Sequence, residues 1–121
     1  MQQRRDDACR FLLAPMIQIR VSFEVPLAER SDFVEASREV MEKSRSESGC
    51  LYYCFSADLN ESTRFHLTEE WDSEQQLQAH LRTSHFATFV SFLGHCKAQR
   101  MTQARSGDLI PYQLRPRNSE Q

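Results

Sequence analysis

The stretch FHLTEEWDSEQQLQAHLRTSH, residues 65–85, holds the only tryptophan of the chain, two adjacent glutamates and three of the four histidines. Up to Trp71 it alternates apolar and polar residues, and this period of two predicts a half-buried strand. Ser73 and Gln76 then form the S-x-x-Q pattern that begins many helices. The stretch therefore predicts a strand followed by a helix. Its acids and imidazoles are compatible with a metal site, an acid/base site beside an aromatic pocket, or an ordinary core.

Further elements are expected on the N-terminal side of this stretch. Residues 16–25, MIQIRVSFEV, alternate well and predict a first strand. Residues 27–48 carry apolar residues at helical spacing, with Ser31 as the expected N-cap and Gly49 as the expected stop. Residues 50–58, CLYYCFSAD, predict a second strand. A short polar turn links it to the third strand, at 64–71, so these two strands should be antiparallel.

The C-terminal side predicts two more helices and a last strand. The helix that begins near Ser73 should end at about Leu81. A further helix should begin at Thr83 or Ser84 and end at Gly94. Residues 97–104, KAQRMTQA, form a weaker fourth strand. The order β-α-β-β-α-β predicts an α+β, ferredoxin-like fold with one antiparallel sheet and helices on one face. Aromatic residues on both faces of the second strand also predict a homodimer through the open sheet face.

Composition narrows the class of protein. A chain of 121 residues fits one domain, which we place at residues 16–105, with an N-terminal arm at 1–15 and a C-terminal tail at 106–121. The formal charge is only −2 and no basic stripe stands out, which argues against a nucleic-acid partner. The longest apolar runs are far too short to span a membrane, so we expect no membrane association.

The four cysteines contain no C-x-x-C pair. Cys50 and Cys54 are four residues apart in the predicted second strand, which places them on one face, about 13 Å apart at ~3.3 Å per residue. This separation is too large for a disulfide. We therefore expect reduced thiols and a cytoplasmic location.

Several motifs resemble those of a known family. Residues 47–53 match a Glu-x-Gly-Cys-x-x-Tyr pattern, and the third strand ends in Glu-x-Trp at 69–71. Ala-His-Leu at 79–81 is followed by Thr-x-His and an aromatic residue at 83–86. Over residues 16–104 the chain resembles the antibiotic biosynthesis monooxygenase superfamily, near its quinol monooxygenase-like branch. The resemblance implies a dimeric α+β barrel. It also implies a cofactor-independent monooxygenase that oxidises a small aromatic quinol or phenol with molecular oxygen.

Two residues are the expected catalytic groups. His80 would act as base or proton relay, because the reference pKa of histidine, ~6.5, suits proton transfer near neutral pH. Glu69 would support it, because a carboxylate on a mostly apolar face needs a partner or a role. The substrate would contact five further residues: Trp71, Tyr53, His85, Phe86 and Phe89. The structural alternative is that Trp71 belongs to the core and that His80 is satisfied by Glu69 or a backbone carbonyl.

We expect no flavin, haem or metal cofactor. No Gly-rich dinucleotide loop is present, and His80 and His85 lie five residues apart across an expected helix break, not on one helical face. Haem-degrading members of the superfamily use an asparagine on the first strand, and none occurs there. Two other classes of protein remain open. One is a non-catalytic protein that binds or senses small aromatic molecules, and the other is a structural dimer whose cavity is filled by its own side chains.

Overall fold

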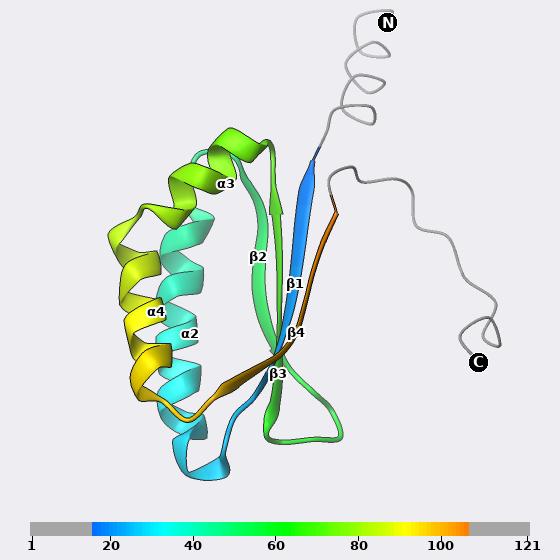
Figure 1. Cartoon of the computed structure of the whole chain (residues 1–121), viewed down its shortest axis with the longest axis vertical. Helices are drawn as coiled ribbons and strands as arrows, with labels where there is room; N and C mark the ends of the chain where they lie inside the picture. The colour runs from blue at the N-terminus through cyan, green and yellow to red at the C-terminus, as the bar shows by residue number, and fades with distance from the viewer. Residues whose placement is uncertain (1–15, 107–121) are drawn as a thin grey trace, which may run out of the picture.

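A computed structural model of the protein describes residues 16–106. Four antiparallel strands form one sheet in the order β2-β3-β1-β4, and the three α-helices all lie on the same side of it (Figure 1). In chain order the elements are β1 (Ile17–Glu24), the 3₁₀ turn η1 (Leu27–Glu29), α2 (Arg30–Arg45), β2 (Cys50–Ala57), β3 (Arg64–Trp71), α3 (Glu74–Leu81), α4 (Ser84–His95) and β4 (Gln99–Ser106). The predicted α+β, ferredoxin-like fold is confirmed. The dimer stays a prediction.

The central strands follow the alternation read from the sequence. β1 pairs with β3 from Ile17 opposite Trp71 to Glu24 opposite Arg64. In β3 every second residue is buried, beginning at Phe65 and ending at Trp71. This period of two turns one face of the sheet toward the helices, and that face carries both the core and Glu69.

The core is a cluster of aromatic rings around Phe33 of α2, which is fully buried. The centroid of its ring lies 5.4 Å from that of Phe23 on β1 and 4.9 Å from that of Phe65 on β3. The ring of Phe89 on α4 lies 6.2 Å away. These separations are typical of packed aromatic pairs. The cluster therefore joins α2 and α4 to the middle of the sheet.

Local capping explains how the second helical region divides. The hydroxyl of Ser73 accepts a hydrogen bond from the backbone of Gln76, as the S-x-x-Q pattern predicts. The Thr83 hydroxyl donates to the carbonyl of His80 and accepts from the backbone of Phe86. One side chain therefore ends α3 and begins α4. The helix break predicted at this point is confirmed.

Three local predictions are wrong. Ser31 is not an N-cap, because η1 precedes α2 and the cap position falls on Glu29. Gly94 lies inside α4, which continues to His95. Cys50 and Cys54 do not share a face: a register shift after Cys50 places it opposite Trp71, whereas Cys54 lies opposite Thr68. One extra residue in β2 reverses the alternation, as a β-bulge does.

Within residues 16–106, none of the helices has the length and apolar character needed to cross a membrane. The predicted N-terminal arm, residues 1–15, lies outside the described residues. The predicted tail does too, apart from Ser106 at the end of β4.

Candidate functional site

Glu69 carries a carboxylate buried in the face of the sheet that meets the helices, and the residue is only 7% exposed. The indole Nε1 of Trp71, two residues along β3, donates to its Oε1 over 2.8 Å. Burial raises the pKa of Glu69 to about 7, because it disfavours the charged form. The Trp71 hydrogen bond lowers this pKa and the nearby charge of Glu47 raises it. Glu69 can therefore take up or release a proton near neutral pH.

A cavity of about 230 Å³ lies against this face. Strands β1 and β3 supply apolar side chains to its lining, as do α3 and α4; examples are Ile19, Leu67, Leu77, Phe86 and Phe89. Tyr53 from β2 joins them, and burial raises the pKa of its hydroxyl far above the usual value, so that it remains a neutral donor. Among the described residues that line the cavity, Glu69 is the only acid. The site is thus a largely aromatic and aliphatic pocket with one carboxyl group, and Arg100 and Arg105 also contribute to its lining.

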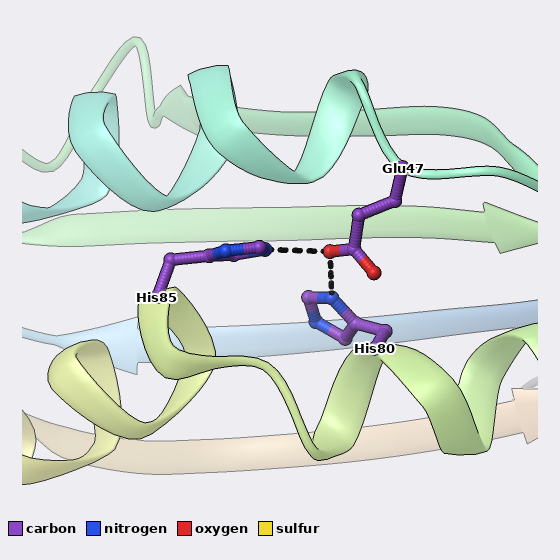
Figure 2. A group of neighbouring side chains, drawn as sticks. All are labelled: Glu47, His80 and His85. Carbon is purple, nitrogen blue, oxygen red and sulfur yellow. Dashed lines mark hydrogen bonds and ion pairs between the residues drawn. The ribbon is translucent and has the colours of Figure 1, made fainter.

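A second polar cluster joins Glu47, His80 and His85 (Figure 2). Nδ1 of His80 lies 2.7 Å from Oε2 of Glu47, and Nε2 of His85 lies 2.6 Å from the same oxygen. Figure 2 shows the two imidazoles approaching the carboxylate from α3 and α4, while Glu47 reaches down from the turn that follows α2. A single carboxylate therefore ties two helices to that turn.

His80 is the completely buried member of this cluster. Its ring packs on Trp71 with 4.6 Å between centroids. Burial lowers the pKa of His80, and the Glu47 carboxylate acts in the opposite direction. Within the described part of the chain, the other ring nitrogen, Nε2, has no hydrogen-bond partner. A chain of contacts thus runs from Glu47 through His80 to Trp71 and on to Glu69.

The three donors of this cluster lie within 4.8 Å of one another. Two imidazoles and a carboxylate are a ligand set that zinc and non-haem iron use. However, the separations of 2.6 and 2.7 Å are those of hydrogen bonds. A ligating histidine also normally donates its second ring nitrogen to a partner, which Nε2 of His80 lacks among the described residues. The geometry therefore favours a hydrogen-bonded cluster over a metal centre.

The seven residues predicted for the site fall into two groups. Glu69, Tyr53, Phe86 and Phe89 line the cavity. Trp71, His80 and His85 are absent from its lining, and the two imidazoles lie instead beside the Glu47 carboxylate.

Sequence reasoning missed Glu47 as a site residue, although it begins the Glu-x-Gly-Cys motif. The five-residue spacing of His80 and His85 also gave no sign that the two rings meet. The helix break at Thr83 is what lets both rings reach one oxygen of Glu47.

Comparison with known proteins identifies the family of this chain. Residues 16–91 match the model of the antibiotic biosynthesis monooxygenase family. An uncharacterized protein of Synechocystis is 32% identical over 74 residues, which cover 61% of this chain and 50% of that one. The chain thus spans half the length of this relative.

Two further proteins are similar to this chain. YcnE of Bacillus subtilis, named as a candidate monooxygenase, is 28% identical over 76 residues, which cover 63% of this chain and 80% of YcnE. A crystal structure of a candidate antibiotic biosynthesis monooxygenase from Deinococcus radiodurans shares the fold. Its TM-score is 0.74 at 18% identity, and the match covers 83% of this chain and 99% of that one. The chain belongs to the antibiotic biosynthesis monooxygenase family.

Proposed function

We propose that the protein is a monooxygenase that oxidises a small aromatic quinol or phenol with molecular oxygen and without a bound cofactor. Family membership supports monooxygenase activity in general. The observation that carries the finer proposal is Glu69, a single carboxyl group with a pKa raised to about 7 in an otherwise largely apolar cavity. A base whose pKa lies near the working pH is suited to general acid–base catalysis.

The proposed reaction begins with proton transfer from a quinol hydroxyl to Glu69. The quinolate is electron-rich and gives one electron to oxygen, and the resulting radical pair combines into a carbon–oxygen bond. The ring carbon then passes its hydrogen as a proton to the terminal oxygen while the O–O bond breaks, so that hydroxide departs, and this hydroxide takes the proton from Glu69 to become water. Quinol and oxygen become a hydroxyquinone and water, so the substrate itself supplies all the electrons. An apolar cavity protects such intermediates from side reactions with water.

In this scheme His80 is a positioning residue. Its ring does not line the cavity, but it packs on Trp71, which donates to Glu69. Glu47 holds the imidazole in place. His80 therefore acts on the carboxyl group through the indole, and His85 shares the support of Glu47.

The other residues of the cavity serve the substrate. Tyr53 contributes a neutral hydroxyl that can donate to a quinol oxygen. Phe86 and Phe89 supply aromatic surface for the ring. Dimerisation through the uncovered face of the sheet remains part of the proposal. It would cover exposed side chains such as Tyr52 on β2.

The test is oxygen consumption with 1,4-dihydroxynaphthalene, corrected for autoxidation. Glu69→Gln should reduce turnover roughly 10²–10⁴-fold, the usual contribution of a general base. Glu70→Gln is the matched control, because Glu70 is the next residue of β3 and bonds to Gln18.

Three outcomes count against parts of the proposal. Full activity in Glu69→Gln together with loss in His80→Ala would return the role of base to His80. No uptake by the wild-type protein above autoxidation would exclude oxidation of this quinol. Tight binding without uptake would make the protein a binding or sensing module.

A further inference from the structure

The wall of the cavity formed by β4 is polar, whereas the other strands and the helices supply mostly apolar side chains. Arg100, Gln103 and Arg105 all contribute to it. The sheet register places Arg105 opposite Ile19, Gln103 opposite Val21 and Arg100 opposite Phe23. The partner residues on β1 belong to the face that meets the helices. Two guanidinium groups and an amide thus stand where a buried sheet would carry apolar residues.

The contacts of Arg100 and Arg105 leave their positive charges available to bind an anion. Arg100 donates to the side-chain oxygen of Gln103 over 2.7 Å, which brings the two groups together without neutralising the charge. Arg105 pairs with Glu74 of α3, but both side chains are about half exposed, at 47% and 51%. An exposed ion pair of this kind is worth little and is readily exchanged for another anion.

The position of Glu69 relative to Arg105 sets the dimensions of a ligand, whereas Arg100 lies further along β4, opposite Phe23. Ile19 pairs with Glu69 on one side and with Arg105 on the other, so the three residues form one row across the sheet. Two strand spacings of ~4.8 Å separate the backbones of Glu69 and Arg105 by roughly 10 Å. A one-ring or two-ring molecule spans this distance once the side chains reach toward each other. The cavity volume of about 230 Å³ also favours a small ligand, because it is below the ~300–1,000 Å³ of pockets that hold drug-sized molecules.

We propose that Arg105 is the centre of an anion subsite that binds the carboxylate of a hydroxylated aromatic acid, with Arg100 adding positive charge along the same wall and the far hydroxyl of the ring placed at Glu69. The substrate class is then a quinol that carries a carboxylate. Guanidinium groups suit this role, because their planar donors match a carboxylate. The reacting end of this assignment rests on the proposed function, whereas the subsite itself concerns binding alone.

Anaerobic binding of two probes tests the subsite. 1,4-Dihydroxy-2-naphthoate and 1,4-dihydroxynaphthalene differ only in the carboxylate, and calorimetry without oxygen measures both affinities. We expect the acid to bind roughly tenfold or more tightly, as for a hydrogen bond between charged groups. The Arg100→Gln/Arg105→Gln double variant should lose this preference. Arg20→Gln on β1 should keep it, because Arg20 lies on the opposite face of the sheet.

Two results would overturn the subsite: equal affinity of the wild-type protein for the two probes, or a preference for the acid that survives in the double variant. Raised salt should weaken binding of the acid and leave the neutral quinol unchanged, and the reverse would count against the proposal. Oxygen uptake is scored separately. A preference for the acid without uptake would leave the subsite standing and overturn the monooxygenase reaction. Oxygen uptake without a preference for the acid would support the monooxygenase reaction and overturn the subsite.

Discussion

At the scale of single residues, β3 shows how one step along a strand separates two chemically identical side chains. Glu69 faces the helices, is nearly buried and has a pKa raised to about 7. Glu70 faces the other way and accepts a hydrogen bond from the amide of Gln18. Strand alternation alone accounts for this difference. A buried acid that accepts one hydrogen bond from an indole is only partly compensated, so its protonation is sensitive to that bond.

Replacing Trp71 with Phe should move the acid limb of the pH–rate profile to higher pH. The indole hydrogen bond lowers the pKa of Glu69, so its loss raises that pKa. A hydrogen bond to a charged group contributes about 1.5–3 kcal/mol, which corresponds to roughly one to two pH units. The measurement is kcat/KM against pH, with circular dichroism to confirm that the variant folds. An acid limb that stays at the wild-type pH would show that Glu69 does not govern the rate.

At the scale of elements, the turn between α2 and β2 determines where Glu47 lies. Gly49 has φ = +83°, a conformation that other residues rarely adopt. A Cβ atom there would lie 2.3 Å from Cγ and 2.6 Å from Cβ of Gln76 on α3. The Gly49 carbonyl also accepts from the backbone of Asp72 over 2.8 Å. The turn is thus held against α3 at a distance that only glycine allows, which brings Glu47 to His80.

Gly49→Ala should therefore destabilise the protein, by roughly 1–3 kcal/mol in the free energy of unfolding from backbone strain, with the contact to Gln76 adding to this cost. Urea denaturation measures the change. Gly94→Ala is the matched control, since Gly94 lies inside α4 and nothing stands within 4 Å of an added Cβ. It should stabilise the helix by up to about 1 kcal/mol. Equal changes at the two positions would contradict the role given to the turn.

At the scale of the whole molecule, two buried groups couple stability to pH in opposite directions. Burial raises the pKa of Glu69 from 4.5 to about 7, so the folded state holds this proton more tightly than the unfolded state. This contribution is complete below about pH 4.5 and is lost as pH rises to about 7. Burial lowers the pKa of His80, so its contribution is present above its ordinary value of 6.5 and is lost as pH falls through the lowered value. The contribution of these two groups to the pH dependence of the unfolding free energy is therefore the sum of two opposite effects.

Comparison of the wild-type protein with Glu69→Gln isolates the contribution of the glutamate. Between pH 4.5 and 7 the wild-type protein should lose about 3 kcal/mol of unfolding free energy relative to the variant, since each pKa unit corresponds to about 1.4 kcal/mol. Chemical denaturation across this range measures both proteins. A difference that is constant with pH would mean that Glu69 titrates alike in the folded and unfolded states.

The sequence by itself determined the elements and much of their order. Alternation located β1 and β3, and the residues Ser73 and Thr83 marked the starts of α3 and α4. The buried position of Glu69 also followed from this alternation. These features depend on the local preferences of residues only a few positions apart. They can therefore be predicted from the amino-acid sequence alone.

Only the tertiary structure decided which side chains meet. The bulge in β2 turned Cys50 and Cys54 to opposite faces, and the break at Thr83 brought His80 and His85 to the carboxylate of Glu47. It also placed the arginines of β4 on the cavity wall, whereas the sequence indicated only a weak strand there. Register, helix packing and cavity lining arise from contacts between residues distant in sequence, which periodicity does not encode.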